Sequence, residues 1–233
     1  MKSQLAVVKN VERLQDAFGS LESRHLELPG MALIYGYTGA GKTFAVTHMM
    51  TRFRGVFIRA WSTWTANNML GAITRELGGS AIRWNQPMVD FIVQELVRNE
   101  RPLFVDEVNH IDNSGQMMHL LRDIHDTTGV PVVMISEETT PRKIARFPQI
   151  AGRIYESVEF KPLDLEDMHT LAEAVCEVEV ADDLLKKLHR DTDGNMRMAT
   201  DGLAKIERMA RTNGIAKVTV QDWGSRKFVF GQR

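Results

Sequence analysis

The residues best suited to chemistry form a glycine-rich run in the first fifth of the chain. Residues 36–43 read Gly-Tyr-Thr-Gly-Ala-Gly-Lys-Thr, which fits G-x-x-x-x-G-K-[ST] without deviation. Glycines let the backbone turn so that successive N–H groups face phosphate oxygens. Lys42 is expected to reach the β and γ phosphates of a nucleotide, and the Thr43 hydroxyl to ligate Mg²⁺. The predicted nucleotide contacts in the loop are Gly36, Thr38, Gly39, Ala40, Gly41, Lys42 and Thr43.

A pair of acids follows a second apolar run. Residues 102–107 read Pro-Leu-Phe-Val-Asp-Glu, so both carboxylates stand where a strand would end. Asp106 is predicted to bind Mg²⁺, and Glu107 to orient and activate the attacking water as a base. Taken alone, such a pair is equally typical of a solvated strand end. Beside the loop at 36–43 it predicts hydrolysis, rather than the transfer to an acceptor that kinases with this loop perform.

The elements that must position these groups alternate along residues 1–162. Short apolar runs at Met31–Tyr35, Val56–Arg59, Leu103–Val105, Val130–Ile135 and Ser157–Phe160 predict strands. Helix-period segments between them predict helices at 44–52, 65–77, 88–98 and 115–126. This alternation predicts an α/β class with a mostly parallel sheet covered on both faces. The loop at 36–43 then joins the first strand to the N-terminus of the first of these helices, where the helix dipole favours phosphate.

The pattern changes after Pro162. Residues 164–177, 181–190 and 195–211 read as helices, with Asp193-Gly194 as a turn. The sequence therefore predicts two domains, an α/β nucleotide-binding domain at 1–162 and a small helical domain at 163–233.

Composition narrows the class of protein. Among 233 residues, 43% are hydrophobic, 25% are charged and the net charge is −1, which predicts a folded globular chain rather than a uniformly basic nucleic-acid coat protein. No run approaches the ~18 apolar residues of a membrane span, and Leu5–Val8 is too short for a signal peptide. Cys176 is the single cysteine, so no intramolecular disulfide or cysteine zinc site is expected. These features predict a cytoplasmic protein in a reducing environment.

Charge is uneven on a finer scale. Residues 28–75 contain no Asp or Glu but five Lys or Arg, which suits them to phosphates. Residues 164–183 contain eight carboxylates and no Lys or Arg, and are predicted to form a solvated helix face. His110, His119 and His125 lack ligand spacing, so surface positions are expected rather than a metal site.

Together these motifs resemble the AAA+ ATPases. The resemblance covers the loop at 36–43, Val105-Asp106-Glu107, the helical region after Pro162, and Gly194-Asn195-Met196-Arg197, which is similar to the G-N-x-R second sensor of that family. It implies ATP and Mg²⁺ as ligands, an αβα sandwich followed by a helical lid, and a contact from Arg197 to the γ-phosphate. The alternative for Arg197 is an exposed helical arginine.

More narrowly, the chain resembles the phage Mu B and TnsC-type ATPases that select DNA targets for transposition. The resemblance lies in residues 130–138, followed by Arg146 and Gly152-Arg153-Ile154. The first sensor of the family is usually Asn, Ser or Thr, and here either Ser136 or Glu137 could occupy that place at the nucleotide. The Mu type carries an N-terminal helix-turn-helix region. Only 30 residues precede Met31, so that DNA contact is expected to be absent or supplied by another chain.

The resemblance also implies that nucleotide binds between subunits and that a neighbour's arginine completes the site. Arg153 directly precedes the last strand, where the family places this residue, and Arg146 is the second candidate. Such an arginine stabilises charge on the transferring phosphoryl group. The alternative for Arg153 is a surface salt bridge of small energetic value.

The same resemblance implies that the loop after the second strand, with the helix region that follows, grips duplex DNA inside a helical filament. The candidates are Arg59, Thr65, Asn67 and Arg83, whose side chains can contact phosphates and sugars without reading bases. The alternative for Arg59 is a solvated strand end. Trp61 and Trp64 are expected to pack within the domain.

The function implied is an ATPase that assembles with ATP as a ring or helical filament on duplex DNA without sequence preference. It would deliver this target to a transposase in a bacterial or phage-infected cell, and hydrolysis would release it. The alternative is an AAA+ module that acts on protein partners, such as a helicase loader or a secretion-associated ATPase, without direct DNA contact.

Overall fold

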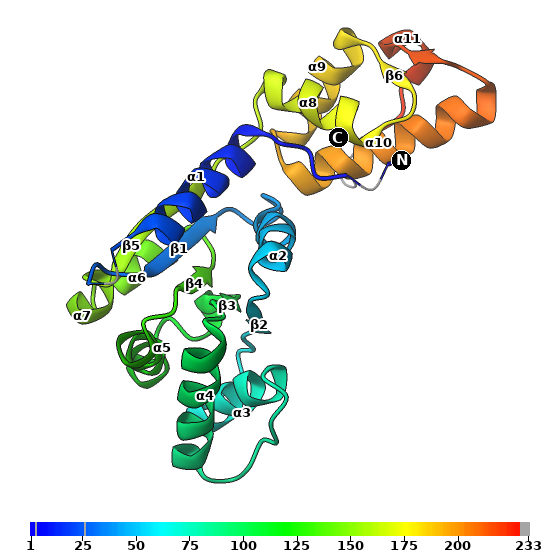
Figure 1. Cartoon of the computed structure of the whole chain (residues 1–233). Helices are drawn as coiled ribbons and strands as arrows, with labels where there is room; N and C mark the ends of the chain where they lie inside the picture. The colour runs from blue at the N-terminus through cyan, green and yellow to red at the C-terminus, as the bar shows by residue number, and fades with distance from the viewer. Residues whose placement is uncertain (3, 26, 229–233) are drawn as a thin grey trace. The chain divides into compact units, whose positions relative to one another are not determined.

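The computed structural model describes residues 1–2, 4–25 and 27–228, which form two compact units (Figure 1). We call residues 14–37 and 42–159 the α/β unit. Residues 1–13, 38–41 and 160–233 form the helical unit, of which the last five residues lie outside the described part. The predicted division at 162/163 stays a prediction. No helix in the described part of the chain has the length and apolar character needed to cross a bilayer.

The α/β class with a mostly parallel sheet is confirmed. The strands are β1 (Met31–Gly36), β2 (Val56–Arg59), β3 (Leu103–Asp106), β4 (Val132–Ile135) and β5 (Ile154–Phe160). They lie in the order β2-β3-β4-β1-β5, and the pairs β2/β3, β3/β4 and β1/β4 are parallel. β3 and β4 are buried along their whole length, which explains their uninterrupted apolar sequences. β5 lies at an edge, where exposed residues alternate with half-buried ones at its start and with buried ones at its end, so its first residues carry a weaker apolar signal.

Register determines which strand ends meet. In the β2/β3 pair, Arg59 lies opposite Asp106, the last residue of each strand. In the β1/β4 pair, Ile34 lies opposite Ile135, so the start of the glycine-rich loop adjoins the end of β4. Ligands of open α/β sheets bind at the carboxyl ends of the strands, and this edge gathers the predicted chemistry.

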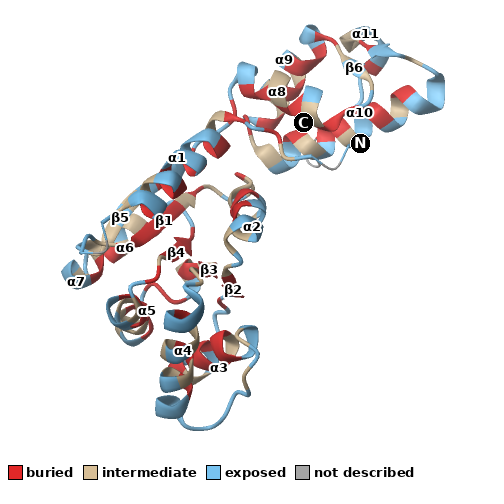
Figure 2. Ribbon diagram, in the orientation of Figure 1, coloured by how far each residue is buried: buried red, intermediate tan, exposed pale blue. Residues whose placement is uncertain are grey.

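The helices of the α/β unit begin and end close to the predicted positions. They are α2 (Lys42–Phe53), α3 (Ala66–Glu76), α4 (Asn85–Asn99) and α5 (Gly115–Thr128), with α6 (Thr140–Ile144) and α7 (Pro148–Ala151) as short additions. α1 (Lys9–Ser23) precedes the sheet and is not among the predicted helices. Buried apolar side chains of the strands and of α3, α4 and α5 form the core, seen as red segments of these ribbons in Figure 2.

The helical unit contains α8 (Leu165–Val175), α9 (Asp182–Thr192), α10 (Met196–Asn213) and α11 (Val220–Trp223), with a two-stranded parallel sheet of β6 (Glu179–Val180) and β7 (Lys217–Val218). Seven of the eight carboxylates in 164–183 are exposed, in line with the predicted solvated face. Asp167 is the exception, because it closes the capping box at the start of α8 and accepts a hydrogen bond from the Lys9 amide.

Candidate functional site

The glycine-rich loop has the backbone that its sequence predicts. Gly36, Gly39 and Gly41 have φ angles of +149°, +86° and +85°. Residues with a Cβ rarely adopt positive φ, so the loop depends on glycine at these points. β1 ends at Gly36 and α2 begins at Lys42, which places the loop directly at a helix N-terminus. This is the geometry that presents backbone N–H groups to an anion.

Lys42 is folded back onto this loop. Its Nζ donates to the Gly36 carbonyl at 2.7 Å and to the Tyr37 carbonyl at 2.9 Å. Partial burial lowers the pKa of Lys42, and the nearby charges of Glu107, Asp106, Glu137 and Glu138 oppose that shift. A charged phosphate oxygen is a stronger acceptor than either carbonyl. The ammonium group is therefore expected to give up these carbonyls for the phosphates when a nucleotide binds.

Thr43 and Asp106 come together at the end of β3. The Thr43 hydroxyl donates to the carboxylate, with Oγ1 3.1 Å from Oδ2 and 3.3 Å from Oδ1. Asp106 is 2% exposed, and a buried carboxylate requires a cation or several donors. A hydroxyl and a carboxylate oxygen at the edge of a phosphate loop are hard oxygen ligands suited to Mg²⁺, which takes only one or two protein carboxylates. The residues present therefore fit the metal that the sequence predicts.

Arg59 supplies the cationic partner of Asp106. Its Nε and Nη2 lie 2.9 and 2.8 Å from Oδ2, as the register of β2 against β3 dictates. The Arg59 side chain is 54% exposed, so the guanidinium reaches the buried carboxylate from the surface. Arg59 therefore ends β2 with an exposed side chain, as the solvated strand end predicts, and also pairs with Asp106. Its predicted contact with DNA stays a prediction.

Glu107 has an unusual backbone. Its φ and ψ are 57° and 40°, in the left-handed region, and its N–H donates to Asp106 Oδ1 at 3.0 Å. Such a conformation in a residue other than glycine costs about 1–3 kcal/mol and is concentrated at functional sites. The conformation turns the chain abruptly after β3, directly beside the predicted metal ligand.

The two first-sensor candidates have different environments at the end of β4. Ser136 is buried, its N–H donates to the Ile34 carbonyl, and its hydroxyl donates to the Glu137 carbonyl. Glu137 is exposed. Both remain candidates, and Ser136 adjoins β1 just before the loop.

Within the helical unit, Asn195 contacts the loop residues directly. Its Nδ2 donates to the Thr38 carbonyl at 3.0 Å, and its Oδ1 accepts from Met198 N–H as the N-cap of α10. A Cβ on Gly39 would lie only 2.7 Å from Asn195 Oδ1. Asn195 belongs to the G-N-x-R motif, but the sequence predicts no role for it. The G-N-x-R motif is the sequence feature that could have indicated this contact.

Arg197 approaches the loop through its backbone. Its N–H donates to the Gly39 carbonyl at 3.0 Å, and its side chain is exposed. Its predicted role as second sensor is still a prediction.

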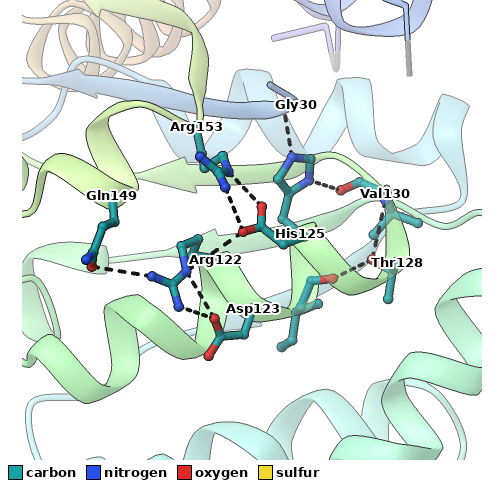
Figure 3. Close-up of polar contacts among 10 residues, drawn as sticks. Gly30, Arg122, Asp123, His125, Thr128, Val130, Gln149 and Arg153 are labelled. Atoms are coloured by element: carbon teal, nitrogen blue, oxygen red, sulfur yellow. Dashed lines mark hydrogen bonds and ion pairs between the residues drawn. The ribbon is translucent and has the colours of Figure 1, made fainter. Parts of the chain in front are cut away.

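Arg153, the residue that precedes β5 in the chain, forms an ion pair with Asp126 (Figure 3). Its Nε and Nη2 lie 2.8 and 3.1 Å from the two carboxylate oxygens of Asp126 on α5. Hydrogen bonding to Asp126 raises the pKa of the Arg153 guanidinium. A surface cavity of about 510 Å³ is lined by both residues. Arg146 is exposed and has no side-chain ion pair within residues 1–2, 4–25 and 27–228.

His125 corrects the expectation that all three histidines lie at the surface. It is buried, because its ring connects two backbone groups: Nε2 accepts from Gly30 N–H at 3.1 Å and Nδ1 donates to the Val130 carbonyl at 2.8 Å (Figure 3). Burial lowers the pKa of His125, which favours the neutral ring that this pairing requires. His110 is exposed, and His119 contacts Phe147 edge-on. The described residues contain no cluster of three His, Cys, Asp or Glu able to hold a metal.

The other DNA candidates gather at the N-terminal end of α3. Thr65 is the N-cap of α3, in a capping box with Asn68. The Asn67 side chain donates to the Ile82 and Arg83 carbonyls and to Asn85 Oδ1, at 2.9–3.3 Å. The Arg83 guanidinium lies 5.5 Å from the centre of the Trp84 ring. The structure thus brings Thr65, Asn67 and Arg83 together, but directs Arg59 to Asp106.

Trp61 and Trp64 differ in how far they are buried. Trp64 packs against the core of the α/β unit, as predicted. The same expectation for Trp61 is wrong, because Trp61 is 65% exposed. The two belong to one turn, in which Trp64 N–H donates to the Trp61 carbonyl, and this turn directs the second indole inward and leaves the first outside.

Comparison with known proteins identifies the family of this chain. A family described as AAA domain matches residues 25–143, just over half of the chain. A curated protein of Staphylococcus aureus, described as a potential ATP-binding protein, is 24% identical over 128 residues. That match covers 51% of this chain and 46% of the relative, so the chain corresponds to less than half of that protein.

Solved structures share the fold at low identity. The Aeropyrum pernix ORC1 protein, solved in complex with DNA, has a TM-score of 0.68 and 17% identity and covers 95% of this chain and 64% of its own. Pyrobaculum aerophilum Cdc6p has a TM-score of 0.65 and 17% identity, covering 92% and 64%. The Aeropyrum pernix ORC2 protein in its ADP form has a TM-score of 0.71 and 15% identity, covering 95% and 69%. These likenesses extend over both units described above.

Proposed function

This chain belongs to the AAA domain family, and we propose that it is an ATPase that binds ATP and Mg²⁺ at the loop 36–43. The observation that carries the proposal is the convergence of Lys42, Thr43 and Asp106 at the carboxyl edge of the sheet. Backbone N–H groups of the loop and the Lys42 ammonium would hold the phosphates, while Thr43 and Asp106 would hold the metal. When bound, Mg²⁺ would neutralise charge on the phosphate oxygens.

Glu107 is the proposed base. It directly follows the metal ligand, and its left-handed backbone separates its side chain from the course of β3. In this role its carboxylate orients a water molecule toward the γ-phosphate and accepts the proton. Ser136 or Glu137 would sense the γ-phosphate from β4, and Arg197 from α10.

Arg153 is the proposed trans arginine. Its place before β5, on an exposed surface, is compatible with contact to a neighbouring subunit, and Arg146 is the second candidate. A guanidinium inserted into the neighbour's site would stabilise charge on the transferring phosphoryl group. Hydrolysis would then depend on self-association into a ring or filament.

The wider function we propose is ATP-dependent assembly on duplex DNA and delivery of that DNA to a transposase, as in the Mu B and TnsC-type ATPases. Support comes from the carboxylate-free stretch 28–75 and from Thr65, Asn67 and Arg83 near the start of α3. The ORC1 neighbour, which shares the fold, was solved in complex with DNA. The second candidate is an ATPase that acts on a protein partner, which the engagement of Arg59 by Asp106 favours, because it removes one cation from the DNA surface.

The experiment separates nucleotide chemistry from DNA binding. Phosphate release and nucleotide affinity would be measured for the wild type, Lys42→Ala, Glu107→Gln and the exposed control His48→Ala on α2. Glu107→Gln should keep ATP affinity and lose about 10²–10⁴-fold in kcat. Lys42→Ala should lose ATP affinity, and His48→Ala should match the wild type. Wild-type hydrolysis in Glu107→Gln would refute the assignment of the base.

Assembly would be imaged by electron microscopy with ADP, ATP or a non-hydrolysable analogue, with and without duplex DNA. Filaments that require both the ATP-state nucleotide and DNA are the expected result. Closed rings or monomers indifferent to DNA would favour the protein-partner ATPase.

A further inference from the structure

The connection from α3 to α4 is exposed, and its ribbon is pale blue in Figure 2. It carries aromatic and cationic residues. Trp84, the residue before α4, is 67% exposed, and Ile82 is 42% exposed. Arg83 lies over the Trp84 ring at 5.5 Å. We call Trp61, Ile82, Arg83 and Trp84 the indole patch. Large apolar side chains gathered at a surface mark binding sites more often than isolated ones do.

Asn67 fixes the patch to the body of the α/β unit. Its side chain makes three hydrogen bonds to residues 82–85, so the segment carrying Trp84 is tied to the first turn of α3. Trp61 belongs to the turn that leads into the Thr65 N-cap of the same helix. Two exposed indoles from separate segments thus lie on backbone that is attached near the same end of α3.

The charge around the patch indicates the chemistry of the partner. Residues 60–89 contain a single carboxylate, Glu76, but also Arg75 and Arg83. An exposed indole beside a guanidinium is the combination that stacks on a base while neutralising the adjoining phosphate. A protein partner with an apolar face would not require the cation or the scarcity of carboxylates.

We propose that the indole patch binds unpaired bases of DNA that is opened or kinked, with Trp84 and Trp61 stacking on bases and Arg83 on phosphate. In a fully paired duplex the faces of the bases are covered by their neighbours, so an indole can reach them only where a step is unstacked. This inference rests on the proposed DNA-binding function. It adds that the ATPase prefers distorted sites over fully paired DNA.

The test measures affinity by fluorescence anisotropy with a non-hydrolysable ATP analogue, for two labelled duplexes of equal length. One duplex is fully paired, and the other has a central mismatched bubble. Stacking contributes enough per base that the wild type should bind the bubble about tenfold more tightly. Trp84→Ala and Trp61→Ala should lose this preference while keeping the affinity for the paired duplex, and Trp84→Phe should retain most of it. Arg83→Ala should weaken both complexes to a similar degree.

The matched control is Val97→Ala, which removes an exposed apolar side chain (53%) elsewhere on α4 and should leave both affinities unchanged. Urea unfolding and ATP affinity would establish that each variant is folded. Equal wild-type affinity for both duplexes, with paired-duplex binding intact, would overturn the patch proposal alone. No binding to either duplex, with ATP hydrolysis intact, would overturn the DNA function itself.

Discussion

At the residue scale, Arg153 is both a candidate catalytic group and half of an intramolecular ion pair. A trans arginine must leave its own subunit's acid to enter the neighbour's site, so the bidentate contact with Asp126 opposes that step. The pair is exposed, and the free energy at stake is within about 1 kcal/mol. Asp126 is therefore expected to restrain Arg153 without blocking it.

We predict opposite effects for the two partners in this pair. Arg153→Ala should lower kcat of the assembled ATPase by about 10³-fold, the lower range for an arginine finger, with unchanged ATP affinity. Asp126→Asn should raise kcat at limiting protein concentration by up to about fivefold, because Arg153 is released. Steady-state phosphate release checks both. Arg146→Ala is the comparison, and a larger loss there than in Arg153→Ala would transfer the role to Arg146.

His125 makes stability depend on pH. Because burial depresses its pKa below 6.5, the unfolded chain binds a proton that the folded chain does not as pH falls below that value. The contribution is therefore fully present above pH 6.5 and is lost toward lower pH, where protonation removes the acceptor for Gly30 N–H.

The measurement is the urea unfolding free energy across this pH range. The wild type should lose stability on acidification more steeply than His125→Gln, since the variant has no titrating ring at this position. His110→Ala removes an exposed imidazole and should follow the wild type. An identical pH slope in wild type and His125→Gln would contradict the assignment.

At the scale of elements, the N-terminus of α3 raises the question whether Thr65 contacts DNA or only caps the helix. The Thr65 hydroxyl accepts from Asn68 N–H and Asn68 accepts from Thr65 N–H, so the capping box uses both side chains. We predict that Thr65→Ala lowers the unfolding free energy by about 1 kcal/mol, while Thr65→Ser, which keeps the hydroxyl, is near neutral. DNA affinity measured on the same variants separates the two roles. If Thr65→Ala weakens DNA binding without loss of stability, Thr65 is a contact rather than a cap.

The sheet and most helices were accessible from sequence because burial on both faces leaves an unambiguous signal. β2 was predicted at Val56–Arg59 and begins and ends there. α1 was missed although Val11, Leu14, Phe18 and Leu21 repeat at helical spacing, because no capping residue or turn marks its start. Helix-period residues without such boundaries are the weaker signal.

In the candidate site, too, some features could be predicted from the sequence and others could not. The loop at 36–43 and Asp106-Glu107 are contiguous in the chain, so their chemistry could be predicted from spacing. The contacts Arg59–Asp106 and Asn195–Thr38 join residues 47 and 157 positions apart. The first depends on the register of β2 against β3 and the second on the packing within the helical unit, and no local pattern encodes either.

At the scale of the whole molecule, charge balance limits how DNA could be bound. The net charge is −1, and residues 164–183 add a block of exposed carboxylates. Attraction to DNA therefore cannot come from the net charge and must come from local cations such as Arg83. Binding through few phosphates releases few counterions, so each contact forms a large part of the salt dependence.

This leads to a prediction about ionic strength. The logarithm of the duplex association constant should fall linearly with the logarithm of salt concentration, with a slope near −0.9 for each phosphate neutralised by a subunit. Arg83→Ala should reduce the slope by about one and weaken all sequences equally, since a phosphate contact carries no sequence information. Arg98→Ala removes an exposed cation at the other end of α4 and should leave the slope unchanged. Because assembly multiplies the contacts of one subunit, the slopes must be compared at equal occupancy along the duplex. An equal reduction of the slope in Arg83→Ala and Arg98→Ala would mean that DNA affinity depends on the total charge of the unit. The surface at the start of α3 would then not be the DNA-binding site.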